Sequence, residues 1–198
     1  MKNEFRKLCL ENKKFNRYLF SKKIEKELLK ISKDHKNILL FIPLKNEVDI
    51  RGVINTLRRQ KKNIFVPFMQ DLSFKMVKYS LPLKKKKFSI LEPLNKNKAL
   101  EKIDLAIVPI IGMDSEFKRI GFGKGMYDRF FGTLKYKPKV VFLQLRPCIS
   151  KHKLTNDFDI KADEFISFNV RRKNEHFNRY SRFFFIRSRG IFHNQKDG

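Results

Sequence analysis

The chain has 198 residues, a hydrophobic fraction of 41% and 21 phenylalanines, enough apolar material for one folded α/β domain and too much for a disordered chain. Its formal net charge of +26 has two interpretations, a compositional bias toward lysine or binding to a polyanion. That polyanion could be a nucleic acid, an anionic membrane surface or a phosphate-rich ligand, and composition alone leaves all of these open.

The cysteines and histidines give no sign of a metal site. Cys9 and Cys148 are too few and too far apart to indicate a disulfide framework or a zinc site, and the histidines lack metal-ligand spacing. We therefore expect structural or surface roles for all of them. The sequence has no apolar run of the roughly 18 to 20 residues that a membrane span needs, and its start lacks the apolar centre of a signal peptide. We expect a soluble, cytoplasmic protein in a reducing compartment.

The first third of the chain predicts helices alternating with strands. Residues 2–32 are expected to form a helix with Ser21 as an N-cap, because apolar residues recur near helical spacing. The apolar run 37–43 is typical of a buried strand. Asp49 is expected to cap a following helix, and residues 64–67 are expected to form a second strand.

The next hundred residues continue this alternation. Residues 73–91 predict a hairpin or meander around a lysine-rich turn, and the run 104–111 is the strongest buried-strand signal. A polar loop, a glycine-rich turn and a helical stretch over 127–134 follow. Further strands are expected at 140–144 and 164–168. The pattern predicts an open, largely parallel α/β sheet that is covered on both faces.

The last thirty residues differ in kind, because arginines there are interleaved with phenylalanines and tyrosines. Such a mixture can hold single-stranded nucleic acid by phosphate contacts and base stacking. The alternative is a terminal strand and an amphipathic tail packed on the domain, which we favour because no nucleic-acid-binding module accompanies the segment. We therefore predict an α/β domain over 1–168 and a basic, aromatic-rich tail over 169–198.

A glycine-rich turn is the most informative segment of the sequence. Gly121, Gly123 and Gly125 let the backbone adopt left-handed dihedral angles and approach a ligand closely. Successive backbone N–H groups in such a turn form an anion-binding nest, and the following helix adds its positive N-terminal end. The segment therefore indicates a phosphate site, with a tight solvent-exposed connection as the alternative.

Charged side chains around this turn fit the same interpretation. Lys124 places a mobile cation inside the turn, and Arg119 and Arg129 flank it. Asp128 is well placed to hold Mg²⁺ that is shared with phosphate oxygens. The spacing matches neither the Walker nor the dinucleotide motif, but its position after a strong buried strand favours a ligand site, since α/β sheets bind ligands beyond the carboxyl ends of their strands.

Several blocks of the sequence, in the right order, resemble the 5-formyltetrahydrofolate cyclo-ligase family. The family's "D-x-x-(I/V)-V-P-G-x-x-F-D" and "R-L-G-x-G-x-G-Y-Y-D-R" blocks resemble residues 107–114 and 119–128. Its K-x-x-x-R opening resembles residues 2–6, and its "E-(V/I)-D-T" block with the following "v-x-x-P" resembles residues 43–50 and 64–67. Its late "x-x-D-x-(V/I)" block resembles residues 161–165, so the resemblance extends over about residues 2–168.

The resemblance implies an activity and roles for individual residues. It implies ATP- and magnesium-dependent conversion of 5-formyltetrahydrofolate to 5,10-methenyltetrahydrofolate, on a three-layer α/β/α sandwich with a largely parallel sheet of the ribose-5-phosphate isomerase-like kind. The implied ATP contacts are Lys2, Arg6, Arg119, Ile120, Gly121, Phe122, Gly123, Lys124, Gly125, Met126 and Tyr127. The implied folate contacts are Ile42, Glu47, Phe122, Gly123, Lys124, Gly125 and Met126. The implied catalytic residues are Lys124 and Arg119, and the implied magnesium ligands are Asp128 and Asp163.

Structural alternatives exist for the residues outside the turn. Lys2 and Arg6 could simply belong to a basic surface helix, Glu47 could stabilise the start of the next helix, and Ile42 could be core. Without the family, Asp163 would be an ordinary solvated carboxylate. The sequence also departs from the family pattern near the folate pocket, at Ile50, Ile111, Met113 and Met126.

Two other functions compete with the cyclo-ligase activity. The first is a basic nucleic-acid-binding protein that keeps the fold without the activity. The second is a kinase-like enzyme that acts on another small molecule. We expect 5-formyltetrahydrofolate and MgATP as partners, no membrane, and a monomer because no apolar repeat indicates an interface.

Overall fold

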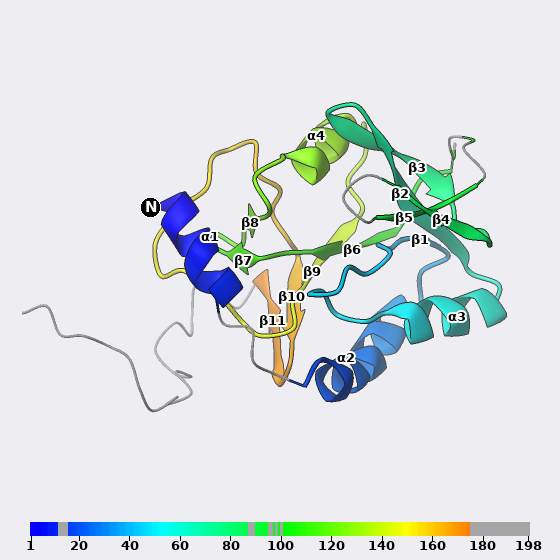
Figure 1. Ribbon diagram of the computed structural model, residues 1–198, viewed down its shortest axis with the longest axis horizontal. Helices are drawn as coiled ribbons and strands as arrows, with labels where there is room; N and C mark the ends of the chain where they lie inside the picture. The colour runs from blue at the N-terminus through cyan, green and yellow to red at the C-terminus, as the bar shows by residue number, and fades with distance from the viewer. Residues whose placement is uncertain (12–15, 87–89, 95–96, 98, 100, 175–198) are drawn as a thin grey trace, which may run out of the picture.

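A seven-stranded sheet organises the chain in the computed structural model, which describes residues 1–11, 16–86, 90–94, 97, 99 and 101–174 (Figure 1). The strand order is β11-β10-β9-β6-β1-β2-β3. The five central strands run parallel and the two edge strands run antiparallel to their neighbours. The strands of this sheet are β1 (Asn37–Leu39), β2 (Asn63–Gln70), β3 (Ser73–Lys78), β6 (Leu105–Pro109), β9 (Lys139–Leu143), β10 (Glu164–Ser167) and β11 (Val170–Lys173).

The apolar runs of the sequence form the centre of this sheet. All five residues of β6 are buried, and β6 pairs with β1 on one side and with β9 on the other. A strand between two parallel neighbours, covered on both faces, has no solvent-facing side, so its sequence is continuously apolar. The predicted strands 37–43, 64–67, 104–111, 140–144 and 164–168 are each confirmed within a few residues.

Helices cover the two faces of the sheet. α2 (Arg17–Ser32) and α3 (Arg51–Arg59) lie on one face, where Leu28 and Leu57 pack into a core cluster with the central strands (Figure 1). α4 (Met126–Gly132) lies on the other face, where Phe130 packs in a second cluster with Phe74 and Phe142. The predicted α/β class with helices on both faces is therefore confirmed.

Two small hairpins extend from this framework. β4 (Leu83–Lys85) pairs antiparallel with β5 (Leu91–Pro93), which confirms a hairpin in the lysine-rich region. β7 (Gly112–Met113) pairs with β8 (Arg119–Ile120) directly after β6. This second hairpin leads the chain from the carboxyl end of β6 into the glycine-rich turn.

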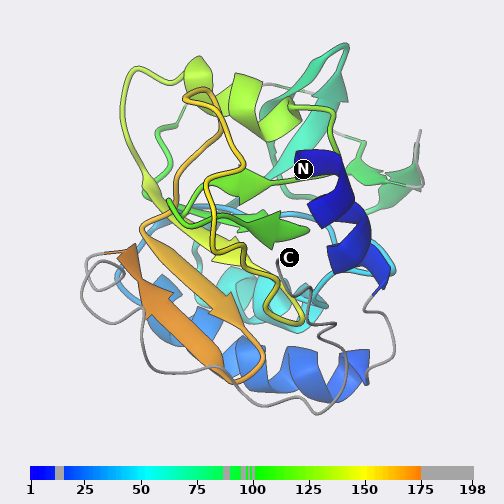
Figure 2. The ribbon, with the colours of Figure 1, turned by 90° about the vertical axis from the view of Figure 1, so that its left-hand side faces the viewer.

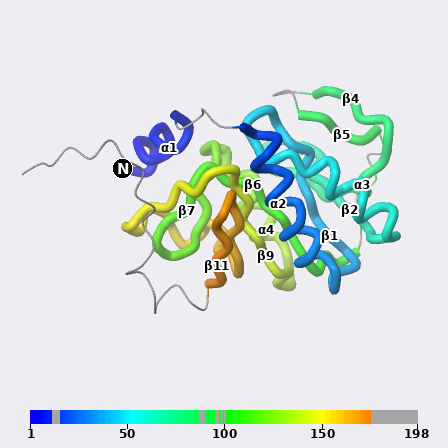
Figure 3. Tube along the Cα trace, turned by 90° about the horizontal axis from the view of Figure 1, so that it is seen from below, coloured from blue at the N-terminus to red at the C-terminus, as the bar shows by residue number. Residues whose placement is uncertain are grey.

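The prediction of one helix over residues 2–32 is wrong. α1 (Lys2–Glu11) ends before α2 begins at Arg17, and the side chain of Asn16, not Ser21, accepts the capping hydrogen bond from the Leu19 N–H at 3.1 Å. Ser21 lies buried inside α2 instead. α1 lies apart from α2, next to β7, and none of its own side chains is fully buried (Figures 2 and 3). The apolar spacing behind the prediction lies in the second helix, whereas the sequence around residue 12 is a run of polar residues, 11–14, followed by the capping Asn16.

A disulfide joins α1 to the rest of the domain. Cys9 and Cys148 are bonded with a Cα–Cα distance of 5.7 Å, although 139 positions separate them in the sequence. The interpretation that these two cysteines are too far apart in the sequence to indicate a disulfide is therefore wrong, whereas the expected structural role is correct for both. Gly112 makes the close approach possible, because a Cβ atom there would lie 2.9 Å from the Cys9 sulfur and 2.8 Å from the Phe5 ring.

The sheet continues past the predicted domain boundary at residue 168. β11 pairs antiparallel with β10, so this boundary falls inside a hairpin. Within β11, the Arg171 guanidinium is paired with Glu164 and Glu27, each at 3.0 Å, and so serves the fold. The remainder of the predicted basic and aromatic tail, residues 175–198, lies outside the described residues. Across the described ranges, no helix is long and apolar enough to cross a membrane.

The disulfide should contribute measurably to stability. We expect Cys9→Ser to lower the free energy of unfolding by about 2–4 kcal/mol, because the bond closes a long loop of the unfolded chain. Denaturant unfolding without reductant measures this change. The Cys9→Ser, Cys148→Ser double variant should lose no more than either single variant, since all three lack the same bond. Two free thiols in the denatured, unreduced wild-type protein would contradict the bond itself.

Candidate functional site

The glycine-rich turn lies at the carboxyl end of the central strands. β8 leads directly into it, and the Arg119 Nε atom in β8 donates to the Pro109 carbonyl at the end of β6, at 3.2 Å. Open α/β sheets bind their ligands at this edge. The sequence prediction of a site after the strongest strand is therefore consistent with the position of the turn.

The glycines of the turn meet two different requirements. Gly123 and Gly125 have φ angles of 89° and 59°, in the left-handed region that favours glycine. Gly121 has an ordinary φ, but a Cβ atom there would collide with the Arg119 guanidinium. The turn is thus built to run close over a buried arginine.

Arg119 provides that buried charge. Its side chain is 8% exposed and lies 3.8 Å from the Asp128 carboxylate and 4.8 Å from the centre of the Tyr127 ring. Burial lowers the pKa of Arg119, while Asp128, Tyr127 and Glu47 oppose this shift. The Arg119 guanidinium thus places a positive charge directly against Gly121 of the turn. Because the side chain is buried, water screens this charge only weakly.

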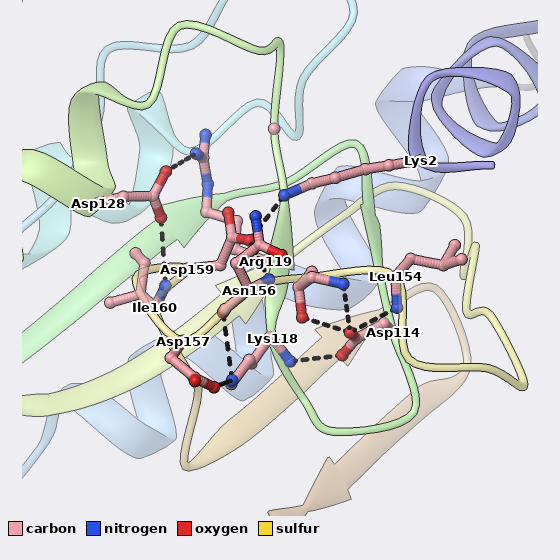
Figure 4. A network of polar contacts seen from close by, with 12 residues as sticks. Lys2, Asp114, Lys118, Arg119, Asp128, Leu154, Asn156, Asp157, Asp159 and Ile160 are labelled. Carbon is pink, nitrogen blue, oxygen red and sulfur yellow. Dashed lines mark hydrogen bonds and ion pairs between the residues drawn. The ribbon is translucent and has the colours of Figure 1, made fainter.

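α1 brings two further cations to the turn, as the resemblance implied for Lys2 and Arg6. The Arg6 Nε atom donates to the Gly121 carbonyl at 2.6 Å. The Lys2 Nζ atom lies 2.6 Å from the Asp159 carboxylate (Figure 4). Both side chains therefore reach the same edge of the sheet from a helix more than a hundred positions away in the sequence.

Lys124 and Arg129 have different positions. Lys124 is exposed at the tip of the turn, and its carbonyl accepts a hydrogen bond from the Arg129 guanidinium. Arg129 also donates through Nε to the Leu72 carbonyl at 2.6 Å. Arg129 thus braces the turn against the β2–β3 hairpin, and Lys124 is left as the solvent-facing cation within the turn.

Glu47 lies in the loop between β1 and α3 and shares its surroundings with Arg119. Its Oε2 atom accepts from the Leu44 N–H at 2.8 Å. Burial raises the pKa of Glu47, and Leu44, Arg119 and Arg17 partly offset this effect. Burial also raises the pKa of Tyr127, with a further contribution from the negative charge of Glu47, so this phenol stays neutral.

The remaining implied contact residues are mainly apolar. Ile42 is half-buried, next to the loop that carries Glu47. Phe122 is 54% exposed at the turn, whereas Ile120 is buried in β8. Met126 is half-buried, and its carbonyl accepts from the Ser73 hydroxyl at 3.3 Å. Met113, one of the departures from the family pattern, is fully buried in the core.

The two predicted magnesium ligands lie in different places. Asp128 accepts from the Ile160 N–H at 3.2 Å, beside Arg119 (Figure 4). Asp163 accepts from the Val140 N–H at 2.8 Å and lies 3.9 Å from Lys137, near the amino end of β9. That point lies about 10 Å along the strands from their carboxyl ends, given the rise of roughly 3.3 Å per strand residue. The network around Arg119 does not include Asp163.

Asp159 is the carboxylate that the sequence analysis missed. It pairs with Lys2, accepts from the Asn156 N–H at 2.8 Å and acts electrostatically on Arg119. The described residues contain no group of three or more histidine, cysteine or acidic side chains that could hold a metal ion. Mg²⁺ commonly uses one or two carboxylates together with phosphate oxygens and waters, so Asp128 and Asp159 fit such an ion better than Asp163 does.

Asp114 fixes the loop that carries Asp159. This carboxylate is fully buried and accepts hydrogen bonds from backbone N–H groups on both sides of the site (Figure 4). Two of these donors follow β7, and two belong to the segment that leads to Asp159. The donors are Glu116, Lys118, Leu154 and Thr155. The sequence pattern contained Asp114 but gave it no role.

The fold and the site together define an α/β protein with a cationic, glycine-rich turn at the carboxyl edge of its sheet and a half-buried carboxylate beside it. The chain matches the sequence model described as the 5-formyltetrahydrofolate cyclo-ligase family over residues 3–146. It therefore belongs to this family, as its motifs indicated.

Curated relatives carry the name of the family. A 5-formyltetrahydrofolate cyclo-ligase of Haemophilus influenzae is 31% identical over 102 residues, which cover 48% of this chain and 54% of that protein. One of Mus musculus is 28% identical over 145 residues, or 65% of this chain and 71% of that protein. The match thus spans about half the length of the first relative and 71% of the length of the second.

Solved structures confirm the fold. The NMR structure of 5,10-methenyltetrahydrofolate synthetase from Aquifex aeolicus has a TM-score of 0.74 at 23% identity and covers 96% of this chain and 99% of its own. A 5,10-methenyltetrahydrofolate synthetase from Mycoplasma pneumoniae has a TM-score of 0.62 at 21% identity, with 84% and 97% covered.

Proposed function

We propose that this chain catalyses the ATP-dependent cyclisation of 5-formyltetrahydrofolate to 5,10-methenyltetrahydrofolate, with release of ADP and phosphate. One observation carries the proposal. The glycine turn, the cations of α1 and the half-buried Glu47 meet around the buried Arg119. Membership of the cyclo-ligase family supports the same activity.

The turn would hold the nucleotide phosphates. Backbone N–H groups of Gly121 to Gly125 can donate to phosphate oxygens in a nest, and Lys124 can close over them from the solvent side. Arg119 supplies positive charge from below. Lys2 and Arg6 already lie beside the turn, where Lys2 bonds to the Asp159 carboxylate and Arg6 to the Gly121 carbonyl. A phosphate of ATP would bind these two cations in place of their present partners or together with them.

The folate would lie on the Glu47 side of the turn. A pterin presents an amide N–H and an exocyclic amine side by side, and a carboxylate can accept from both. Glu47 is a half-buried carboxylate in the loop between β1 and α3, and it interacts electrostatically with Arg119 and Tyr127. Ile42, Phe122 and Met126 offer apolar surface for the flat ring.

The chemistry would need alignment and charge neutralisation more than a strong base. The formyl oxygen would attack the γ-phosphorus and displace ADP, which gives an N5-iminium phosphate. N10 would then attack the activated carbon and lose its proton, and phosphate would leave and take up that proton as the C–O bond breaks. Lys124 and Arg119 would stabilise the negative charge that develops on the transferred phosphoryl group.

Magnesium is part of this proposal. Asp128 and Asp159 would hold the ion at the edge of the turn, and position favours Asp159 over Asp163. When bound, Mg²⁺ neutralises phosphate charge and orients the β- and γ-phosphate oxygens. We also propose a monomer, because no apolar repeat of the sequence indicates an interface. We propose the cytoplasm as its location from the sequence alone, although the Cys9–Cys148 bond is of a kind that reducing compartments rarely keep.

A direct assay tests the proposed activity. Mixing the protein with MgATP and 5-formyltetrahydrofolate should produce the absorbance of methenyltetrahydrofolate, and omission of ATP should abolish it. A correctly folded protein that gives no absorbance change would contradict the proposal. A change that persists without ATP would contradict the role of the nucleotide.

Lys124 should be important for turnover. We expect Lys124→Ala to lower kcat by about 10²-fold or more, the scale on which one charge-stabilising group contributes. Lys135→Ala is the matched control, because Lys135 is another exposed lysine, a few residues beyond α4. Steady-state rates at saturating MgATP measure the effect. Equal rates for the Lys124 variant and wild type would remove Lys124 from the phosphate site.

The magnesium ligands can be distinguished by substitution. We expect Asp128→Asn and Asp159→Asn each to raise the Mg²⁺ concentration that gives half-maximal rate, because each removes one carboxylate ligand. Asp163→Asn should leave this concentration unchanged, since Asp163 bonds to the amino end of β9. If only Asp128→Asn and Asp163→Asn shift the requirement, the ligand set implied by the family resemblance is correct instead.

Folate affinity should depend on the ionisation of Glu47. Because its pKa is raised, Glu47 takes up a proton at a higher pH than an ordinary glutamate. The protonated acid no longer accepts from two pterin donors, so the folate KM of the wild type should rise as the pH falls toward this raised pKa. Glu47→Gln should have a high folate KM at neutral pH and should lack this dependence. A wild-type folate KM with the same pH profile as the Gln variant would count against the role of Glu47.

A further inference from the structure

The loop from Leu44 to Asp49 determines where the Glu47 carboxylate lies. It connects β1 with α3 and is closed on itself, because the Glu47 N–H donates to the Leu44 carbonyl at 3.1 Å and the Glu47 carboxylate accepts from the Leu44 N–H. These bonds define the shape of the loop. They do not attach it to the rest of the protein.

Arg17 attaches one side of this loop to α2. Its Nε atom donates to the Glu47 carbonyl at 2.7 Å, and its Nη2 atom donates to the Leu44 carbonyl at 3.1 Å. Its Nη1 atom lies 3.8 Å from the Asp49 carboxylate. A planar guanidinium can hold two carbonyls in one fixed orientation, which a lysine ammonium cannot do.

Ser21, one turn further along α2, attaches the other side. Its buried hydroxyl accepts from the Asp49 N–H at 2.9 Å. The Asp49 carboxylate in turn accepts from the Arg51 N–H at the start of α3. Both ends of the loop are thus fixed to α2 by side chains that the sequence analysis gave no such role.

We propose that Arg17 and Ser21 are positioning residues that hold the Leu44–Asp49 loop so that Glu47 faces the folate site. This inference rests on the proposed function. Neither side chain contacts Arg119 or the glycine turn in the bonds described, so both would act through Glu47.

Arg17 also influences the charge of Glu47. The charged and titratable groups that face Glu47 are Arg17 from α2, Arg119 from β8 and Tyr127 from α4, with Asp49 in the same loop. Arg17 and Arg119 lower the pKa of Glu47 against the larger effect of burial. Loss of the Arg17 charge should therefore let the pKa of Glu47 rise further.

Steady-state kinetics test the positioning role. We expect Arg17→Ala to raise the folate KM about tenfold or more, because it removes charge-assisted hydrogen bonds to two carbonyls, while kcat and the ATP KM stay near the wild-type values. Arg17→Lys should recover only part of the affinity. Ser21→Ala should have a smaller effect in the same direction. Unchanged folate KM in an active, folded Arg17→Ala variant would overturn the inference.

Arg51→Gln is the matched control. Arg51 is exposed and pairs with Asp49 of the same loop, but it does not bond to the Leu44 or Glu47 carbonyls. Arg17→Gln should shift the low-pH rise of the folate KM to higher pH, and Arg51→Gln should not. A purely structural role of Arg17 predicts no such shift, and equal pH profiles for the two variants would contradict the proposal.

Amide hydrogen exchange separates failure of this inference from failure of the proposed function. The wild type either converts 5-formyltetrahydrofolate or does not, and that result concerns the function alone. In either case, Arg17→Ala should speed exchange in the peptide that contains Leu44 to Asp49, whereas Arg51→Gln should leave it unchanged. Unaltered exchange in Arg17→Ala would show that Arg17 does not hold the loop.

Discussion

The burial of the Arg119 guanidinium beneath the glycine turn is the constraint on which the site depends. Arg119 bonds to the end of β6, lies against Asp128 and Tyr127, and interacts electrostatically with Glu47. A buried cation is costly unless opposite charge or hydrogen-bond acceptors surround it. Asp128 offers one carboxylate at 3.8 Å, too far for a hydrogen bond, which leaves the guanidinium able to attract a further anion.

The position of α1 is a second requirement, because two of the cations belong to it. No side chain of this helix is fully buried, so apolar packing contributes little to holding it. Its attachment depends on the Cys9–Cys148 bond, on the close approach at Gly112 and on the polar contacts of Lys2 and Arg6. The last two contacts lie within the candidate site itself, so under the proposed function nucleotide binding and the docking of α1 would be physically coupled.

Much of the fold could be predicted because local sequence and burial agree. The run that forms β6 is apolar throughout, since both of its faces are covered, and Gly123 and Gly125 occupy left-handed conformations that their residue type favours. Asp159 and Arg17 could not be found in this way. Asp159 belongs to the site because Lys2 reaches it from the other end of the chain, and Arg17 matters because α2 passes beside the Glu47 loop. Both depend on tertiary contacts that no local pattern records.

A crystal structure with a non-hydrolysable ATP analogue tests the central claim most directly. We predict that the terminal phosphates lie against the backbone N–H groups of Gly121 to Gly125, with Arg119 beneath them and the Lys124 side chain closed over them. A nucleotide bound elsewhere, with the turn empty and facing solvent, would contradict this account of the site.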